Sequence, residues 1–505
     1  MSLNYNFIWL LCYLLVLVGL AGYGFHRPSI VYLYWKNRNN KPQPKARFQE
    51  LPVVTVQLPM FNEKFVVDRL LESVAALDYP QDKLEIQILD DSTDDTTEQC
   101  YRKVEELKSR GFDAVCIHRT DRTGFKAGAL EAATKVAKGE FLLILDADFV
   151  PEPDLLQKTI HFFTDENVGL VQTRWGHINR EYNLLTRIQG MYLDGHFAME
   201  QTARNRSGRF FTFNGTAGIW RKCVIGDAGG WSHDTLTEDM DLSYRVQLRG
   251  WRFIYLNDVV TPAELPVDMD GFKSQQHRWT KGSIQVCQKI LLDIWRSNAP
   301  LKAKVEATTH LTCNYSYLLL ALLCFLVYPI CTQRIPENET VFMWFVNVAL
   351  FFMTSVAVCI FYMSAQIVVR PKSWWKELPY LPLLLTLSVG MAVNNAKAVL
   401  EAIFGHQSAF VRTPKYGVDR KEDRRHVSQL KRNGYRAIKS VVIPVLEIAC
   451  GTFFLNLIII MIRQGHYLSP ILMIPFLGFY YTGFCSLGRM ISNLLPAKQT
   501  AKAKN

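Results

Sequence analysis

The chain has 505 residues, of which 49% are hydrophobic, and a net charge of +11. This length exceeds what one compact domain usually holds, so we expect at least two structural units. The basic excess lies beside long apolar runs, which favours membrane lipids as a partner and disfavours nucleic acid, and the eleven cysteines show neither a CxxC pair nor the spacing of a zinc site.

An apolar run from Phe7 to Phe25 lies near the start of the sequence. A transmembrane helix needs about 20 mostly apolar residues, and this run has that length. No charged segment precedes it and no small-residue cleavage site follows it, so we expect a retained membrane span and not a removed signal peptide.

Strand and helix patterns alternate in the region that follows. Apolar runs bounded by turn residues predict strands over Val53 to Pro59, Leu84 to Leu89, Ala114 to His118 and Glu140 to Leu145. Helical patterns lie between them, over Asp68 to Leu77, Thr96 to Arg110 and Phe125 to Lys138. This alternation predicts an α/β domain with a mostly parallel sheet covered by helices. Ligands of such sheets bind beyond the carboxyl ends of the strands.

Two acidic clusters directly follow predicted strands. Asp90 and Asp91 follow the second, where a carboxylate can accept hydrogen bonds from a base or ribose, although the adjoining Ser92 to Asp94 also suit a helix cap. Asp146 and Asp148 follow the fourth strand, two residues apart. Carboxylates so placed suit Mg²⁺ or Mn²⁺ that also bridges a nucleotide diphosphate, although a DxD pattern alone also occurs in surface loops.

Charged residues further along complete a candidate site. Lys126 lies in the segment Arg122 to Gly128, whose cations and glycines precede a helix and suit a diphosphate. Glu238 and Asp239 precede a predicted helix from Met240 to Gln247. They either stabilise the N-terminus of that helix, or Asp239 acts as a general base that takes the proton from an acceptor hydroxyl.

Gln275, Arg278 and Trp279 follow the sheet region. A Trp face can stack on a pyranose ring, and an Arg can neutralise a leaving diphosphate. The same residue types are also common in amphipathic helices at a membrane surface.

The second half of the sequence holds the other candidate spans: Leu311 to Cys331, Val341 to Val369, Leu378 to Phe404, Val441 to Ile462 and Pro470 to Ile491. In the third of these, Lys397 and Glu401 disfavour insertion, because two charges near a helix centre cost about 5 kcal/mol. If the basic clusters on both sides are cytoplasmic, this segment is interfacial or re-entrant and the chain has five spans. The alternative is a sixth span.

The order of these motifs resembles that of the processive glycosyltransferase family 2 enzymes, the cellulose synthase superfamily. The matching residues are Asp90-Asp91, Asp146-x-Asp148, Thr237-Glu238-Asp239, Gln275-x-x-Arg278-Trp279 and Phe410 to Lys415. The last is similar to the FxVTxK gating loop of the family, with Arg412 in place of Val. The resemblance implies an α/β GT-A type glycosyltransferase domain joined to an α-helical transmembrane bundle with interfacial helices.

The resemblance also implies a role for each matching residue. Asp239, beside Glu238, would be the catalytic base, and Asp146 and Asp148 would bind Mg²⁺ or Mn²⁺. The donor would contact Asp90, Asp91, Lys126, Asp146, Gln275, Arg278, Phe410, Thr413 and Lys415. The acceptor would contact Trp279, Asn214, Gly215 and Thr216.

Within the superfamily, Phe213 to Arg221 and Gln275 to Trp279 are most similar to the cellulose-synthase-like A and C branches. These make mannan, glucomannan or glucan, so the expected reaction is processive, inverting β-1,4 transfer from GDP-mannose or UDP-glucose, with translocation of the product. The other expected partners are a growing polysaccharide, membrane lipids and either a second copy of the chain or accessory secretion proteins. We expect a multi-pass protein of the bacterial inner membrane, or of the Golgi or plasma membrane, with a cytoplasmic catalytic domain.

These expectations divide the chain into eight segments. They are a transmembrane helix (1–30), the catalytic domain (48–265), interfacial helices with the QxxRW motif (266–308), two transmembrane helices (309–370), an interfacial or re-entrant helix (371–409), the gating loop with a basic segment (410–435), two transmembrane helices (436–495) and a basic tail (496–505).

Two rival functions remain. A non-processive membrane enzyme of the same fold would glycosylate a lipid such as dolichol phosphate or ceramide, but the QxxRW and gating-loop matches argue against it. A transport or scaffold protein with a degenerate transferase domain is disfavoured by the intact Asp146, Asp148 and Asp239.

Overall fold

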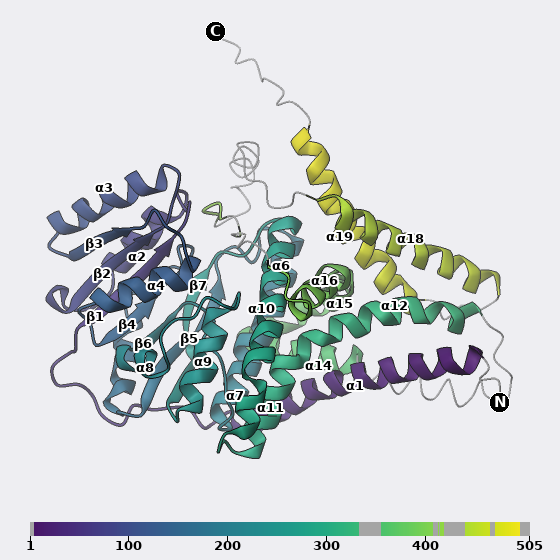
Figure 1. The fold of residues 1–505 in the computed structure, drawn as a ribbon, viewed down its shortest axis with the longest axis horizontal. Coiled ribbons are helices and arrows are strands. Elements are labelled where there is room, and N and C mark those ends of the chain that lie inside the picture. Colours follow the sequence, from purple (N-terminus) through teal and green to yellow (C-terminus); the bar gives the residue numbers. More distant parts are fainter. Residues whose placement is uncertain are drawn as a thin grey trace, which may run out of the picture.

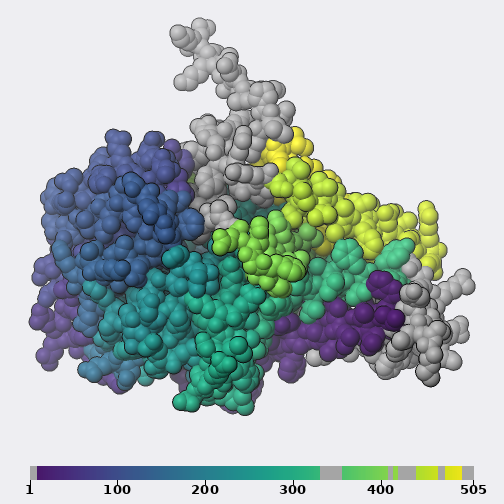
Figure 2. Space-filling model, in the orientation of Figure 1, coloured from purple at the N-terminus to yellow at the C-terminus, as the bar shows by residue number. Residues whose placement is uncertain are grey.

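A computed structural model describes residues 5–332, 355–407, 413, 415–418, 440–464 and 470–494. A lobe that contains the sheet lies on one side, and long helices extend from it on the other (Figure 1). Helix α10 (Met269–Arg296) lies between the two parts. In the space-filling view the lobe is rounded and the helical part is narrower (Figure 2).

Seven strands form one sheet in the order β3-β2-β1-β4-β6-β5-β7. Their bounds are β1 Val54–Met60, β2 Leu84–Asp90, β3 Asp113–His118, β4 Phe141–Ile144, β5 Val168–His177, β6 Gly218–Arg221 and β7 Arg252–Ala263. Strand β1 pairs in parallel with β2 and β4, β2 with β3, and β5 with β7, whereas β6 runs antiparallel to β4 and β5. The prediction of a mostly parallel sheet is confirmed.

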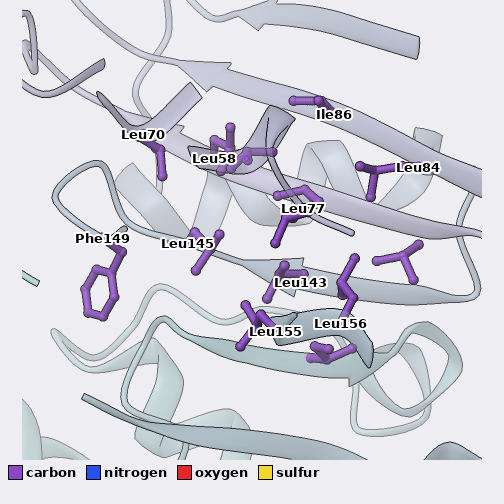
Figure 3. Packing of buried hydrophobic residues seen from close by; sticks show 14 of the residues in the cluster. Leu58, Leu70, Leu77, Leu84, Ile86, Leu143, Leu145, Phe149, Leu155 and Leu156 are labelled. Atoms are coloured by element: carbon purple, nitrogen blue, oxygen red, sulfur yellow. The ribbon is translucent and has the colours of Figure 1, made fainter. Parts of the chain in front are cut away.

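Helices cover both faces of the sheet. Helices α2 (Val67–Ala75) and α3 (Thr96–Ser109) pack on one face, and α4 (Phe125–Val136), α8 (Lys222–Asp227) and α9 (Glu238–Leu248) pack on the other. In α2 the buried residues are Val67, Leu70, Leu71 and Val74, the spacing of one helical face. Figure 3 shows Leu70 among residues of the sheet, with Leu58 of β1 and Leu143 of β4 in the same cluster. Burial of these side chains drives the lobe to fold.

A continuous helical segment crosses the lobe beneath the long helices. It consists of α6 (Leu184–Asp194), the π-helical turn η3 (Gly195–Gln201) and α7 (Thr202–Arg206). A capping box between Asn183 and Thr186 starts α6. Shorter elements complete the lobe: η1 Gln81–Lys83, α5 Leu155–Thr159 and η2 Ile160–Thr164.

The helical part contains α1 Tyr5–Asn37, α11 Leu301–Thr312, η4 Cys313–Tyr315, α12 Ser316–Thr332, α14 Ala357–Val369, η6 Trp374–Tyr380, α15 Leu381–Gly390, α16 Ala392–Ile403, α18 Val442–Arg463 and α19 Pro470–Leu494. Among the described residues, three helices are long and apolar enough to cross a membrane: Ile8–Asn37, Leu301–Pro329 and Val442–Arg463. The predicted span from Val341 to Val369 lies partly outside the described residues.

The segment for which sequence left two alternatives is a broken helix. Trp374–Gly390 and Ala392–Ile403 meet at a bend of 41°, the shape of either a broken span or a re-entrant loop. Three of its polar residues face protein, whereas Lys397 is half exposed. Asn394 and Asn395 are buried, and Glu401 accepts from Lys281 of α10 at 3.2 Å. Internal pairing offsets the cost of these polar groups, and the choice between five and six spans stays a prediction.

Candidate active site

The carboxyl ends of β1, β2 and β4 meet at one edge of the sheet, and a cavity of about 190 Å³ lies beyond them. Thirteen of the residues predicted to act in catalysis or binding line this cavity: Asp91, Lys126, Asp146, Asp148, Asn214, Gly215, Glu238, Asp239, Gln275, Arg278, Trp279, Thr413 and Lys415. They come from segments far apart in the sequence. The sequence gives only the order of these motifs, and the fold brings them together in space.

Lys126, in the first turn of α4, connects two of these motifs. Its Nζ donates to Asp146 Oδ1 and, at 2.7 Å, to the carbonyl of Gly215. Burial by itself lowers the pKa of Lys126, but the charges of Asp146 and Glu238 outweigh it and raise that pKa. The ammonium therefore stays charged beside the strand end, where it suits a diphosphate.

Glu238 and Asp239 form the first turn of α9. Gly215 has a φ of +79°, and a Cβ at that position would meet Asp239 Oδ2 at 3.1 Å, so the chain from Asn214 to Thr216 passes directly beside this carboxylate. Burial, followed by the negative charge of Glu238, raises the pKa of Asp239 to about 7. A carboxylate with its pKa near neutrality is suited to accept a proton from a hydroxyl.

Thr413 and Lys415, the two described residues of the segment that resembles a gating loop, line the cavity. Lys415 Nζ lies 2.5 Å from Asp148 Oδ2 and donates to the carbonyl of Glu264 at 2.9 Å. The Glu264 carboxylate in turn accepts from the backbone N–H groups of residues 416, 417 and 418, at 2.9, 3.0 and 3.2 Å. Phe410 lies outside the described residues.

Asp90 and Asp91 occupy different environments. Asp91 accepts two hydrogen bonds from Arg119, at 2.8 and 2.6 Å, and lines the cavity. Asp90 is fully buried and bonds to His118 Nδ1 at 2.7 Å and to the Thr97 hydroxyl at 2.7 Å. The structure thus places Asp90 behind the cavity wall, where it holds the loop that presents Asp91.

Thr216 likewise lies behind the wall. Its side chain is buried, and its hydroxyl accepts from the backbone N–H of Asp146 at 2.8 Å. This contact fixes the strand end that carries Asp146, so Thr216 acts on the site through Asp146.

Asp146 and Asp148 fit a divalent cation that is shared with a substrate. The described residues contain no group of three or more His, Cys, Asp or Glu side chains that could hold a metal ion. Mg²⁺, however, is often bound by one or two carboxylates, with substrate phosphates as further ligands. Both carboxylates line the cavity, and each is paired with a lysine. Each therefore already lies beside a positive charge.

A second, larger cavity of about 670 Å³ adjoins the first. Six residues line both: Trp175, Leu193, Asn214, Thr237, Asp239 and Trp279. The larger cavity continues between the long helices, where residues of α1, α12, α14, α15, α18 and α19 line it. Asp239 and Trp279 thus lie at the junction of a cavity with charged lining residues at the sheet edge and a larger cavity among apolar helices.

Sequence patterns missed several residues of this site. Glu264 and Trp175 stand in no motif, and the hydrogen bonds of Glu264 join segments up to 154 residues apart. His196 and Glu200 were also missed. Their spacing of four residues is that of neighbours on a helix, and it is the one feature of the sequence that indicates their contact.

The chain has the fold of a GT-A type glycosyltransferase, with an acidic site at the strand ends of a mostly parallel, helix-covered sheet. Residues 52–282 match the glycosyltransferase-like family 2 and residues 218–464 match the cellulose synthase family. The two matched regions overlap, and together they make the chain similar to family 2 glycosyltransferases and to cellulose synthases from residue 52 to residue 464.

Two curated relatives are similar over part of the chain. Glucomannan 4-β-mannosyltransferase 2 of Arabidopsis thaliana is 42% identical over 284 residues, which cover 53% of this chain and 52% of the relative. Glucomannan 4-β-mannosyltransferase 1 of Oryza sativa subsp. japonica is 40% identical over 277 residues, which cover 54% and 53%. The chain spans about half the length of the curated relatives it matches.

A solved structure shares the fold. The mannosyltransferase PcManGT from Pyrobaculum calidifontis, in complex with GDP-mannose and Mn²⁺, superposes with a TM-score of 0.56 at 20% identity, over 78% of this chain and 100% of that one.

Proposed function

We propose that this protein is a processive, inverting glycosyltransferase that extends a β-1,4-linked mannan or glucomannan from GDP-mannose. The observation that carries the proposal is the junction of the two cavities at Asp239 and Trp279. The names of the two curated relatives favour a mannosyl donor over UDP-glucose.

The donor fits the smaller cavity with its diphosphate beside the positive charges of Lys126 and Arg278. Asp146 and Asp148 would hold Mg²⁺ or Mn²⁺, which neutralises charge on the diphosphate when bound. Trp279 supports the terminal sugar of the acceptor by stacking.

Transfer requires one proton movement and one displacement. Asp239 takes the proton from the acceptor hydroxyl, and the oxygen attacks the anomeric carbon of the donor sugar. The bond from that carbon to the phosphate oxygen breaks, and the nucleoside diphosphate leaves with the electron pair. Attack opposite the leaving group converts an α-linked donor into a β-linked product.

The larger cavity supports the processive part of the proposal. A polymer that grows at Trp279 has space to extend between α1, α12, α14 and α18. We place the catalytic lobe on the cytoplasmic side of the membrane and the far end of this cavity toward the opposite side, so that extension and export are one movement.

The test uses purified protein in lipid nanodiscs, incubated with Mn²⁺ and either GDP-mannose or UDP-glucose. We expect a long product from GDP-mannose that β-1,4-mannanase degrades. A product with one added sugar on a lipid would support the non-processive alternative, and no transfer from either donor would overturn the proposal.

Asp239→Asn is the matched variant, because it keeps the size of the side chain and removes the base. We expect transfer to fall about 100- to 10,000-fold, the usual contribution of a general base, while binding of a fluorescent GDP analogue stays measurable. Elongation by this variant at the wild-type rate would refute the assignment of the base.

A further inference from the structure

Asn214 is held on both sides where the two cavities join. Its amide oxygen accepts from Gln201 Nε2 at 2.6 Å, and its amide nitrogen donates to His196 Nε2 at 3.0 Å. Gln201 also donates to the carbonyl of Thr212 at 2.7 Å, which fixes Gln201 itself. The orientation of the Asn214 amide is therefore set by its neighbours.

His196 is held as a hydrogen-bond acceptor at Nε2. Its Nδ1 lies 3.0 Å from Glu200 Oε2, so the Nδ1 proton points to that carboxylate. Burial, followed by the positive charges of Arg204 and Arg27, lowers the pKa of His196 to about 3. The ring is neutral at physiological pH and can accept from Asn214.

An ion cluster stands behind this ring. Glu200 pairs with Arg27 of α1 and with Arg204 of α7, and Arg204 also pairs with Glu306 of α11 at 2.9 Å. The π-helical turn that carries His196 and Gln201 is thereby joined to two helices of the other part of the molecule. Such turns frequently occur at functional sites.

The held amide lies beside the reacting groups. Asn214 lines both cavities, and the adjacent Gly215 backbone lies next to Asp239 Oδ2. The His196 side chain keeps 24% of its surface exposed and lines only the larger of the two cavities, on the side from which an acceptor would arrive.

We propose that His196 and Gln201 are positioning residues that hold the Asn214 amide against the terminal sugar of the acceptor, so that its hydroxyl lies within reach of Asp239. The inference rests on the proposed function and deepens it by assigning the residues that set acceptor affinity. Because His196 and Gln201 lie outside the smaller cavity, in which we place the donor, donor binding does not depend on them.

The experiment compares donor and acceptor kinetics in full-length protein. His196→Leu removes the acceptor atom at Nε2, and His196→Gln restores one with its amide oxygen. For His196→Leu we expect the KM for β-1,4-linked mannan oligosaccharides to rise about tenfold, the effect of one lost hydrogen bond. The KM for GDP-mannose, and the rate of GDP-mannose hydrolysis without acceptor, should stay within twofold of wild type. His196→Gln should recover most of the acceptor affinity.

Two further variants control for folding. Asn214→Ala removes the held amide and leaves the ring in place, so it should raise the acceptor KM in the same way. His161→Gln changes a buried histidine on the far side of the sheet, whose Nδ1 accepts from the Phe48 N–H at 3.2 Å, and should change neither KM.

The outcomes separate the inference from the proposed function. An unchanged acceptor KM in both His196→Leu and Asn214→Ala, or equal losses on the donor and acceptor sides, would overturn the inference alone. A wild-type protein that neither hydrolyses GDP-mannose nor transfers from it would overturn the proposed function and the inference with it.

Discussion

Two adjacent carboxylates, Glu238 and Asp239, share the first turn of α9 and line the same cavity, where the negative charge of Glu238 acts on Asp239. Both face the positive charge of Lys126, which Asp146 partly neutralises. Burial, followed by the negative charge of Glu238, raises the pKa of Asp239 to about 7, so its protonation changes near neutral pH.

The pH dependence follows from this charge balance. Asp239 must be unprotonated to act as a base, so kcat/KM should rise with pH through the region near 7. Glu238→Gln removes a negative charge that raises the pKa of Asp239, so the rising limb of the kcat/KM profile should move to lower pH. Kinetics from pH 5 to pH 9 measure the shift, with the exposed Glu105→Gln as the control. A limb that stays in place would show that Glu238 does not act on Asp239.

The same group affects stability in the opposite direction. A carboxyl whose pKa is raised by folding stabilises the protein below its unfolded-state pKa, and this contribution is lost as pH rises through the folded-state pKa. The base that we propose would therefore be most active in the pH range where it stabilises the protein least.

At the scale of elements, Glu264 at the end of β7 holds the segment from Thr413 to Val418 over the cavity. Its carboxylate accepts hydrogen bonds from three backbone N–H groups. Its Oε2 also lies 3.5 Å from Arg69 Nη2. This carboxylate connects the sheet to a segment about 150 residues later in the chain, and no sequence motif marks it.

We expect Glu264→Gln to weaken this connection, because an amide has one accepting oxygen where the carboxylate has two. The KM for GDP-mannose should rise about tenfold, since hydrogen bonds to charged groups are worth more than neutral ones. The KM for acceptor oligosaccharides should stay within twofold of wild type. The exposed Glu152→Gln is the control, and an equal rise in both KM values would refute a role in donor closure.

Helix α10 is anchored to the long helices by a buried ion pair. Lys273 is 1% exposed, and its Nζ contacts Glu447 Oε2 of α18 at 2.5 Å and the Ser486 hydroxyl of α19 at 2.9 Å. Arg489 of α19 also pairs with Asp268, the N-cap of α10. These contacts set the position of the helix that carries Arg278 and Trp279.

Lys273→Met should destabilise the protein by about 3–5 kcal/mol, because it leaves Glu447 buried without its cation. The double variant Lys273→Met/Glu447→Met should recover much of this loss, because it removes the unpaired charge. Thermal unfolding in detergent measures both. A double variant as unstable as the single one would show that packing, and not charge, holds α10 in place.

At the scale of the whole molecule, the sheet lobe and the helices form the two parts seen in Figure 1. The cavity pair runs from one into the other. The number of spans sets the side of the membrane on which the C-terminal segment lies, and the bent pair Trp374–Gly390 and Ala392–Ile403 bears on that number.

The five-span arrangement predicts where tags become accessible. A tag after Asn505 should be cytoplasmic, and a tag between Pro336 and Thr340 should be external, because the basic clusters favour the cytoplasm. Both positions lie outside the described residues. Labelling of intact and permeabilised cells measures the sides, and labelling of both tags from the same side would refute five spans.

Local patterns were enough to predict the order of strands and helices and the acidic residues at the strand ends. They also predicted most of the helices that form at the apolar runs. Periodicity and turn residues act over a few positions, so they can be recognised without knowing the fold. Parallel strands end at one edge of a sheet, so these patterns also predicted that Asp91, Asp146 and Asp148 would face a common space.

Only the tertiary structure decided which of these residues reach that space. Asp90 and Asp91 are neighbours in sequence, yet His118 and Thr97 hold one inside the lobe, while Arg119 holds the other at the cavity. The contacts of Glu264 and Asn214 were equally beyond prediction, because they join segments whose distance in sequence carries no signal. The chain therefore specifies its candidate chemistry locally, whereas the junction of the two cavities exists only when distant segments pack together.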